Sequence, residues 1–417
     1  LMLLLNFQNQ ALVGKKMKDL SLPVPSGVWS EQTSGIATAL YSISAVDDNV
    51  AWIAGAAGKV LRTINKGLTW TTVTAPNAND IYTIYAFDQN KAIVTSSPST
   101  GTFAYITTNG GANWTQVLAQ TGGFFDDVQF KDANNGLLYG DPVGGRLTLF
   151  KTTNGGFNWD SAGLYYPTAL AGWNNGMYLN GDKVFIGTNS GNLIYSSNFG
   201  SSFSLLATGL TNTYVTWFNN ASIGVTGGAS FSATTNGGTN WAALTVPGTG
   251  NSSGVTGRQN SWWTTRQGTG VYFSSDNGTT WSTQYTAPAG SFYHLTMSRN
   301  GSTIWGVRSN GGIARYGLVT GINPISSTTP DNYSLGQNYP NPFNPTTNIN
   351  FSIPKSGLVT MKVFDILGKE VATLVNGNFN AGSYTVDFNA SNYSSGVYFY
   401  RLDVNGFTEV KRMMLVK

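Results

Sequence analysis

Few residues in this 417-residue sequence have side chains suited to acid–base or nucleophilic chemistry. The sequence has no cysteine, which excludes disulfides, thiolate metal sites and a cysteine nucleophile. His294 is the one histidine, so a metal site built from several histidines is also excluded. Its place beside Tyr293 on an expected inner strand is more typical of a packed or solvated residue than of a catalytic base.

Paired carboxylates are the requirement for glycoside hydrolysis, because both must face the same bond. Asp126 and Asp127 are adjacent on one expected strand, so their side chains should point to opposite faces. Glu31 is expected on an outer strand, far from any central channel. No contiguous Asp-rich loop suggests a calcium site. We therefore expect no catalytic residue, no metal and no cofactor, with a glycoside hydrolase as the less favoured alternative.

Four tryptophans outside the repeats described below are the other candidates for a site. They could form a face on which a sugar or a partner stacks, or they could pack between neighbouring structural units. The sequence leaves both interpretations open. These residues are Trp173, Trp217, Trp262 and Trp263.

An eight-residue pattern, Ser/Thr-x-Asn/Asp-x-Gly-x-x-Trp/Phe, occurs six times. The structural elements that this pattern forms must position the candidate side chains. Successive copies begin 44, 45, 44, 38 and 40 residues apart. This period is typical of the four-stranded blade of a β-propeller. We call the six copies the box turns. Their Asn or Asp, Gly and aromatic positions are Asn65, Gly67 and Trp70; Asn109, Gly111 and Trp114; Asn154, Gly156 and Trp159; Asn198, Gly200 and Phe203; Asn236, Gly238 and Trp241; and Asp276, Gly278 and Trp281.

Each box turn is predicted to be a hairpin. The Asn or Asp side chain can accept a hydrogen bond from the backbone N–H two residues on, and the Gly can adopt a positive φ. The aromatic residue then begins the outgoing strand and offers a large apolar surface for packing between blades. The box-turn residues are thus expected to be structural.

The two ends of the repeat region predict how the ring closes. Residues 303–316 have the strand pair that precedes a box turn but no box turn after it. Residues 27–35 resemble the segment that follows each box turn, with Trp29 at the aromatic position. Joining the two would complete a seventh blade and remove exposed edges. We predict a seven-bladed propeller over residues 26–318, with six or eight blades as alternatives.

The box turns resemble the Asp-box (BNR) repeat of sialidases, sortilin-like receptors and photosystem assembly-factor-like propellers. Five of the six copies carry Asn where Asp is commoner. Sialidases of this family also carry an Arg-Ile-Pro-type motif and an arginine cluster for a carboxylate substrate. No Arg-Ile-Pro tripeptide occurs here. The resemblance therefore implies the fold, and a sialidase-like activity is not favoured.

The composition and periodicity of the sequence change after the repeats. Residues 319–332 are rich in Pro, Ser and Thr without periodicity and are predicted to be a linker. Alternating apolar residues over 333–417 predict a small Ig-like antiparallel β-sandwich. The phrases FDILGKEV and GVYFYRL and a lysine-containing end accompany a proline-rich motif in this segment. That sorting motif comprises Tyr339, Pro340, Asn341, Pro342, Phe343, Asn344 and Pro345.

This C-terminal segment resembles the type IX secretion system C-terminal sorting domain of Bacteroidota and related bacteria. The resemblance implies a Gram-negative host, the type IX secretion machinery as partner, and a cargo that is secreted or attached to the outer cell surface. In this bacterial group Asp-Ser/Thr-apolar is an O-glycosylation pattern. The segment Asp160–Ser161–Ala162 matches it, which makes Ser161 a candidate acceptor.

The remaining features bear on partners. Residues 1–25 are an N-terminal extension in which 1–13 could be a donor strand or the remnant of a signal peptide. No segment is apolar for long enough to span a membrane. The net charge of +4 is scattered, which disfavours nucleic-acid binding. We expect a non-enzymatic extracellular or cell-surface protein with a structural or interaction role, and self-assembly into a filament or coat is one form that this role could take. A glycan- or protein-binding adhesion module is the alternative.

Overall fold

The computed structural model describes residues 28–301, 303–317, 322–326, 329–390 and 393–417. Within these ranges all regular structure is β-strand and no helix is present. The contacts divide the chain into two compact units, with the boundary near Arg315. No helix in the described part of the chain is long and apolar enough to cross a bilayer.

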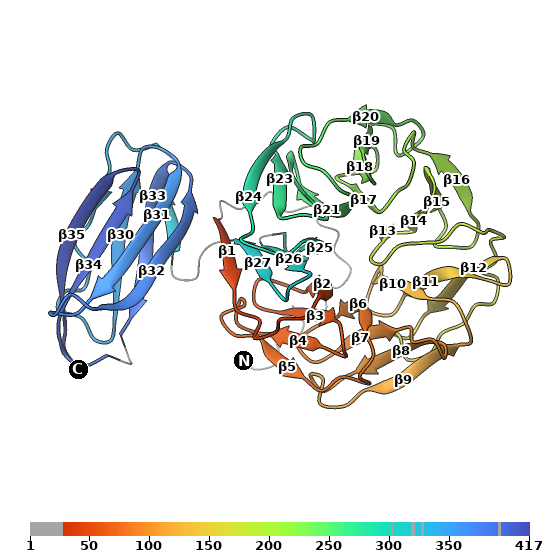
Figure 1. Cartoon of the computed structure of the whole chain (residues 1–417), viewed down its shortest axis with the longest axis horizontal. Helices are drawn as coiled ribbons and strands as arrows, with labels where there is room; N and C mark the ends of the chain where they lie inside the picture. The colour runs from red at the N-terminus through yellow and green to blue at the C-terminus, as the bar shows by residue number, and fades with distance from the viewer. Residues whose placement is uncertain (1–27, 302, 318–321, 327–328, 391–392) are drawn as a thin grey trace, which may run out of the picture. The chain divides into compact units, whose positions relative to one another are not determined.

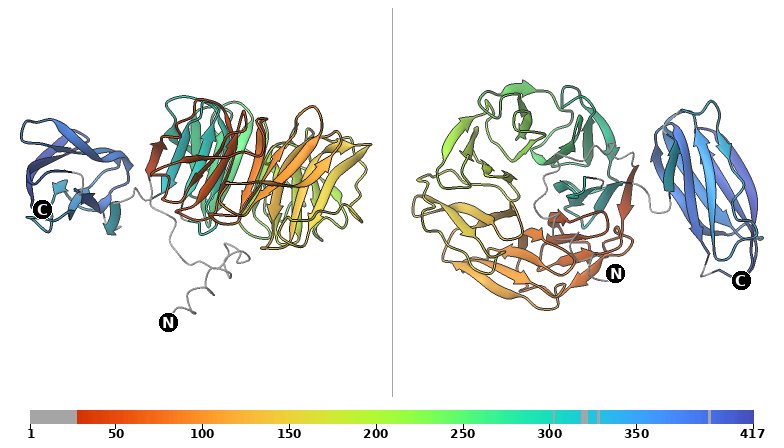
Figure 2. Two further views of the ribbon diagram at one scale, coloured as in Figure 1. Left: turned by 90° about the horizontal axis from the view of Figure 1, so that it is seen from below. Right: turned by 180° about the vertical axis from the view of Figure 1, so that it is seen from behind.

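The first unit is a β-propeller whose sheets surround a central axis (Figure 1). The blades stand edge-on in the side view of Figure 2. Within each of the first three blades the chain runs outward strand by strand as an antiparallel meander. Blade 1 contains β2 (Leu40–Ala45), β3 (Ala51–Gly55), β4 (Val60–Thr63) and β5 (Thr71–Val73); blade 2 contains β6 (Ile81–Ala86), β7 (Ala92–Ser96), β8 (Thr102–Thr107) and β9 (Thr115–Gln120); blade 3 contains β10 (Phe125–Phe130), β11 (Gly136–Val143) and β12 (Arg146–Thr152).

The next three blades repeat this plan with four strands each. Their innermost strands continue the wall of the central channel. Blade 4 contains β13 (Met177–Asn180), β14 (Lys183–Gly187), β15 (Asn192–Ser196) and β16 (Ser204–Ala207); blade 5 contains β17 (Val215–Phe218), β18 (Gly224–Gly227), β19 (Phe231–Thr234) and β20 (Ala242–Leu244); blade 6 contains β21 (Ser252–Arg258), β22 (Ser261–Arg266), β23 (Gly270–Ser274) and β24 (Ser282–Thr286).

Blade 7 is completed by the first strand of the propeller. Its sheet has the order β1-β27-β26-β25, so β1 lies outermost beside β27. Glu31 of β1 accepts hydrogen bonds from the Arg308 guanidinium and from the Tyr285 hydroxyl of blade 6. The prediction of seven blades closed by the N-terminal segment is confirmed. The strands are β25 (Phe292–Met297), β26 (Ile304–Arg308), β27 (Ile313–Gly317) and β1 (Val28–Gln32).

The propeller core lies between adjacent blades. The Trp114 ring of blade 2 meets Trp52 of blade 1 edge-on at 6.4 Å between centroids. The Trp70 ring of blade 1 meets Trp305 of blade 7 at 5.4 Å. Each buried aromatic side chain contributes about 1.5–3 kcal/mol by leaving water. The box-turn aromatics therefore help to hold neighbouring blades together.

The hydrogen bonds of the box turns differ in one respect from the prediction. In the third copy Gly156 N–H donates to Thr152 Oγ1 at 3.0 Å, not to the Asn side chain. Because the Thr hydroxyl takes that N–H, Asn154 Oδ1 accepts from Asn158 N–H, four residues on, at 3.0 Å. All six copies share both bonds. The Gly has a positive φ in every copy, as expected.

The second unit contains a β-sandwich of two four-stranded sheets around one apolar core. The predicted linker over 319–332 needs correction, because residues Ile322–Ser326 form a strand that pairs with the sandwich. The predicted extension over 1–25, including 1–13, lies outside the described residues. One sheet has the order β28 (Ile322–Ser326), β33 (Gly382–Asn389), β30 (Thr346–Ile353), β29 (Ser334–Leu335); the other has β32 (Glu370–Phe379), β31 (Gly357–Phe364), β34 (Gly396–Val404), β35 (Phe407–Leu415).

Candidate functional site

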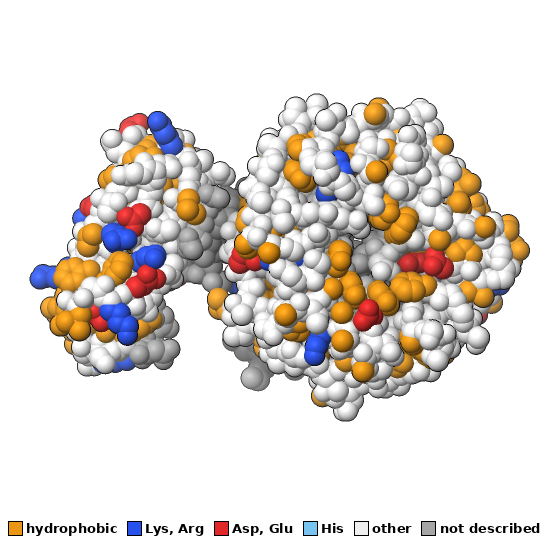
Figure 3. Space-filling view, viewed as in Figure 1, with side chains coloured by type: hydrophobic (Ala, Val, Ile, Leu, Met, Phe, Trp, Pro, Cys, Tyr) orange, Lys and Arg blue, Asp and Glu red, His pale blue; other side chains and the backbone are white. Residues whose placement is uncertain are grey.

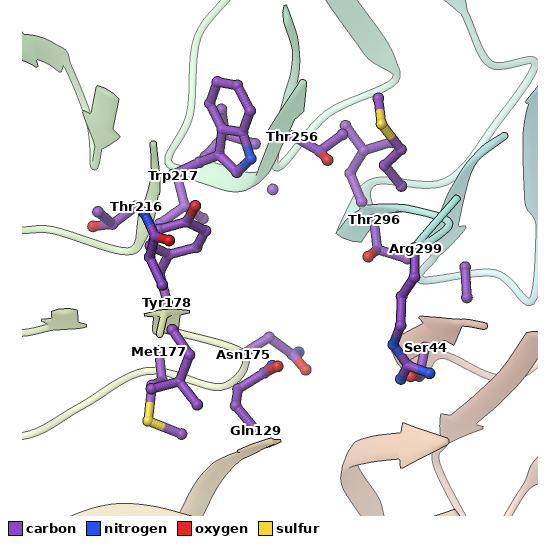
Figure 4. A pocket seen from close by; sticks show the side chains of 18 of the residues that line it. Ser44, Gln129, Asn175, Met177, Tyr178, Thr216, Trp217, Thr256, Thr296 and Arg299 are labelled. Carbon is purple, nitrogen blue, oxygen red and sulfur yellow. The ribbon is translucent and has the colours of Figure 1, made fainter. Parts of the chain in front are cut away.

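A cavity of about 560 Å³ occupies one mouth of the propeller channel (Figure 4). All seven innermost strands contribute residues to its wall, mostly from the ends at which they enter the first loop of the blade. A volume of this size falls within the range of about 300–1,000 Å³ that is usual for ligand pockets. We call this cavity the cup.

A ring of seven side chains forms the middle of the cup. Strand register shows that the seven residues occupy equivalent positions. Each one is paired with the residue at the corresponding position in the second strand of its blade. None of the seven carries a charge, and all line the cavity. They are Ser44, Tyr85, Gln129, Tyr178, Trp217, Thr256 and Thr296, one from each blade in order.

The ring has an aromatic side and a hydroxyl side. Tyr178 and Trp217 lie together in Figure 4, across the cavity from Thr296 and Ser44. Thr256 and Thr296 add two more hydroxyl side chains to the wall of the cavity, and Thr256 is largely buried. Ser44 Oγ accepts from a backbone N–H of blade 2 at 3.0 Å, which leaves its own hydrogen free. The cup thus offers the Thr296 and Ser44 hydroxyls across from the rings of Tyr178 and Trp217.

The charged residues of the cup are already engaged with the protein. Arg299 lies 4.6 Å from the Tyr85 ring centroid and donates to the backbone carbonyl of Ala86. Lys131 pairs with Asp182 at 2.7 Å. Arg258 donates to a backbone carbonyl in the facing loop of blade 7 at 3.1 Å. The positive charges therefore act mainly to fix the loops around the cup.

Asp132 is the one acidic residue among the described residues that line the cup. Burial acts to raise the pKa of its carboxyl, but N–H donors from Asn135 and Asn134 outweigh it and lower the pKa. A carboxylate held in its charged form is a poor general acid. No second carboxylate faces it in the described wall, so the pair required for glycoside hydrolysis is missing there.

Asn175 crosses the channel at the base of the cup. It lies in the loop that leads into blade 4, yet its Nδ2 donates to the Tyr41 carbonyl of blade 1 at 3.2 Å. Its Oδ1 accepts from the Ser42 hydroxyl of the same strand at 2.6 Å. Tyr41 and Ser42 precede Ser44 along β2, so this bridge lies farther from the mouth than the ring. We call residues 172–176 the floor loop.

Asp126 and Asp127 lie beneath the floor loop and are both buried. A bulge between Phe125 and Asp127 interrupts the regular strand alternation on which the expectation of opposite faces rested. Neither residue lines the cup. Sequence reasoning placed them on the correct strand but did not identify their contact with the loop.

His294 lies in the innermost strand of blade 7 and lines the cup. Its Nδ1 accepts a hydrogen bond from the Ile43 N–H of blade 1 at 3.1 Å. Burial lowers its pKa to about 4. The ring is therefore neutral near pH 7 and links the first and last blades.

The four candidate tryptophans fall into different settings. Trp217 lines the cup but is largely buried, with its ring 5.3 Å from that of Trp262. Trp262 and Trp263 are fully buried, so their interpretation as ligand-facing residues is corrected to packing within the core. Trp173 stacks on Tyr214 at 4.0 Å and does not line the cup. The buried tryptophan rings on the central strands therefore form part of the propeller core.

The remaining predicted residues lie on the surface. Ser161 follows the box turn of blade 3 in a half-buried turn, where Asp160 accepts from the Ala162 N–H at 2.8 Å. Its glycosylation stays a prediction. Within the described residues, no group of three or more His, Asp or Glu side chains could hold a metal ion.

The sorting motif is joined to the last strand of the sandwich. Phe343 is buried, and its N–H and carbonyl bond to Met414 O at 2.9 Å and to Val416 N at 3.0 Å. Asn341 Oδ1 accepts from the Met414 N–H at 3.0 Å. Tyr339 is 80% exposed. The motif thus covers the edge of β35 and displays one aromatic ring.

Comparison with known proteins supports both halves of this description. Residues 337–417 match the family model described as a secretion system C-terminal sorting domain. The C-terminal domain thus marks the chain for export. It indicates handling by the type IX secretion machinery and delivery to the cell surface or the surroundings. No curated protein matches the chain.

Solved structures resemble the propeller. YCF48 bound to D1 peptide has a TM-score of 0.58 and 14% identity, covering 72% of this chain and 99% of that one. YCF48 from Cyanidioschyzon merolae has a TM-score of 0.53 and 16% identity, covering 70% and 98%. The WD40 β-propeller domain of Doa1 has a TM-score of 0.55 and 11% identity, covering 71% and 98%. At these identities the likeness shows the fold alone.

One repeated feature was missed at the level of the sequence. The loop after each of several inner strands begins with an Asp or Asn whose side chain caps the loop, as Asp88 does by accepting from Asn90 N–H at 2.6 Å. The same loop then accepts a backbone hydrogen bond from the box turn, as Asn90 O does from Gly110 N–H at 2.9 Å. The box turns therefore brace the loops around the mouth of the cup. The signal was a recurring Asp/Asn-x-Asn/Ser upstream of the box turns.

Proposed function

We propose that this chain is a secreted, non-enzymatic recognition propeller that binds an uncharged, hydroxyl-rich end of an extracellular glycan in the cup. The observation that carries the proposal is the uncharged ring, with Thr296 and Ser44 across the cavity from Tyr178 and Trp217, and with Thr256 next to Trp217. Sugars present hydroxyls at their edges and C–H groups on their faces, and such a divided wall suits both. The C-terminal sorting domain supports the proposal because it indicates export, and glycan polymers are found outside cells.

The charge distribution supports a neutral ligand. The cationic side chains at the cup are committed to carbonyl groups, a carboxylate and a Tyr ring, so an anionic ligand would have to compete with those contacts. The wider surface agrees, since only 10% of the residues are charged and Figure 3 shows few such side chains on the propeller face drawn. The absence of a facing carboxylate pair in the described wall favours binding over hydrolysis.

Binding of the purified protein to an array of neutral and acidic oligosaccharides tests this proposal. Thr256→Val removes a cup hydroxyl and should weaken binding of any neutral hit by about tenfold, the value of one lost hydrogen bond. Thr283→Val in the outermost strand of the same blade is exposed and is the matched control. Binding that Thr256→Val leaves unchanged, or hits confined to acidic glycans, would refute the proposal. Peptide binding is the other outcome to examine, because one similar propeller was solved with a peptide.

Self-assembly into a filament or coat is a second candidate. Strand β32 is an edge strand of ten residues in the sandwich, and an unpartnered edge of that length can accept a strand from another copy. Residues 1–13, the donor strand considered above, lie outside the described residues. Electron microscopy of the purified protein tests this candidate. Thr373 is an exposed position on that edge. Polymers that are lost in the Thr373→Lys variant would support self-assembly, and a protein that stays monomeric at high concentration would exclude it.

A further inference from the structure

The floor loop is held by a group of three acids, of which Asp126 and Asp127 are buried and Asp141 is half-buried. Met177 N–H, just after the loop, donates to Asp127 Oδ2 at 3.1 Å. Gly172 N–H donates to Asp141 Oδ1 at 3.1 Å. Asn175 N–H donates to the backbone carbonyl of Asp126 at 3.0 Å. Three consecutive attachments of one loop therefore use residues Asp126, Asp127 and Asp141.

Tyr139 completes the anchoring from the strand that also carries the third acid. Its hydroxyl donates to the Trp173 carbonyl at 2.6 Å and accepts from the Trp173 N–H at 3.3 Å. The Tyr139 side chain is fully buried. The loop backbone is thus clamped on both sides of Trp173, two residues before the bridging residue Asn175.

The surroundings of the Asp126 carboxyl do not stabilise its ionised form. It is 3% exposed, and its Oδ2 has no hydrogen-bond partner in the described part of the chain. Gly172 packs directly against it, since a Cβ on that glycine would lie 2.9 Å from Oδ2. The charged neighbours that act on Asp126 are Asp141 and Asp127, which are acids themselves. An ionised carboxylate without a partner is costly at such a site.

The same conclusion follows from the titration behaviour of the group. Burial, followed by the charges of Asp141 and Asp127, raises the pKa of Asp126 well above its usual range. Burial raises the pKa of Asp127 to about 7 despite hydrogen bonds from Met177 and Val128. Burial also raises the pKa of Asp141. Acids with raised pKa values favour the folded arrangement at low pH, and that contribution is lost as pH rises through the folded pKa.

We propose that the floor loop is a proton-dependent closure of the cup, held across the channel while Asp126 beneath it is uncharged and released when Asp126 ionises. Ionisation of Asp126 places a charge without a hydrogen-bond partner on Oδ2 beneath the loop, next to buried Asp127. Movement of the loop relieves this cost, because Gly172 packs directly against Asp126 Oδ2 and its departure admits water there. The bridge from Asn175 to blade 1 would then break, and the base of the cup would open. This inference concerns regulation of the site in the proposed function, and its test needs no glycan.

Hydrogen–deuterium exchange of the full chain without ligand tests the closure. After correction for the intrinsic effect of pH, amides of residues 172–177 should exchange at least about tenfold faster at about pH 8.5 than at about pH 5.5. Asp126→Asn keeps the shape but cannot ionise, so most of this acceleration should disappear. Asp182→Asn, which neutralises an exposed acid of the propeller, should behave like the wild type. Equal protection of the wild type at both pH values would overturn the proposal, whether or not Asp126→Asn folds.

Two further outcomes would also overturn it. An acceleration in Asp126→Asn equal to that in the wild type would show that other groups control the loop. Protection restored at high pH by millimolar Ca²⁺ in the wild type but not in Asp126→Asn would show that a cation, not a proton, closes the cup. Failure of glycan binding would leave these measurements unaffected, so the two proposals are tested separately.

Discussion

Asn175 donates its side-chain N–H to the Tyr41 carbonyl over 3.2 Å, which joins the loop before blade 4 to blade 1 across the channel. The backbone of Asn175 has a φ of +58°, in the left-handed region that Asn tolerates better than most residues. A single side chain thus sets the depth of the cup.

Two replacements of Asn175 distinguish how much its side-chain hydrogen bonds and its backbone conformation each contribute to the unfolding free energy. Asn175→Gly preserves the left-handed backbone and removes the two bonds to blade 1, so we expect a loss of about 1–3 kcal/mol in unfolding free energy. Asn175→Ala should cost about 1 kcal/mol more because Ala disfavours that φ. Urea unfolding followed by tryptophan fluorescence measures both, since all twelve tryptophans precede residue 318. Equal stability of the two variants would contradict this account of the backbone.

The ion pair that secures the closing strand should matter more than an ordinary surface pair. The Arg308 side chain is 2% exposed and donates to Glu31 of β1. Glu31→Gln should lower the unfolding free energy by about 1–3 kcal/mol, because a buried guanidinium loses its charged partner. Asp182→Asn breaks the exposed pair with Lys131 and should cost less than about 1 kcal/mol. A similar loss in both variants would mean that Glu31 contributes no more than a surface charge.

Two box-turn glycines with the same φ of +81° differ in the space around them. A Cβ on Gly278 would lie 2.5 Å from the buried Trp262 ring, whereas on Gly200 the nearest atom would be 3.4 Å away. Both Gly→Ala changes should cost about 1–2 kcal/mol for the backbone. Gly278→Ala should cost about 1–3 kcal/mol in addition, because the ring must move. Thermal unfolding of the two variants compares them, and a Gly200→Ala variant that is the less stable would refute this reasoning.

The single histidine gives a direct check on the packing between the first and last blades. Burial lowers the pKa of His294 to about 4, so the neutral ring stabilises the fold above the ordinary pKa of about 6.5. That contribution is lost as pH falls towards 4, because the unfolded chain binds the proton first. A proton NMR titration follows one imidazole resonance without assignment. A midpoint near 6.5 would show that the ring is solvated and does not link the blades.

The sequence predicted the architecture well because its signals are local and repeated. Six turns of one type at near-constant spacing specify blades, and the strand pair 303–316 without a box turn indicated how the last blade is completed. The hydrogen bonds of the turn were predicted less well, because the Thr hydroxyl competes for the N–H of Gly156. The strand Ile322–Ser326 was read as linker because its pairing partner lies about sixty residues away along the chain.

The site was harder to predict for a physical reason. Its ring draws one residue from each blade, and Ser44 and Thr296 become neighbours only when the propeller closes. The two interpretations of Trp262 and Trp263 stayed open at the level of the sequence, because composition alone does not distinguish a buried ring from an exposed one. The role of Asn175 depends on a contact between residues 134 positions apart, which no local pattern indicates.

Hydrogen exchange of the full chain with and without a saturating neutral oligosaccharide from the array tests the central claim most directly. Binding in the cup predicts slower exchange at the ends of β17, β21 and β25 and in the loops that follow them. The same experiment should show no change in the outer strands or in residues 333–417. Protection confined to the outer strands or to the C-terminal domain, with none at the cup, would contradict the account.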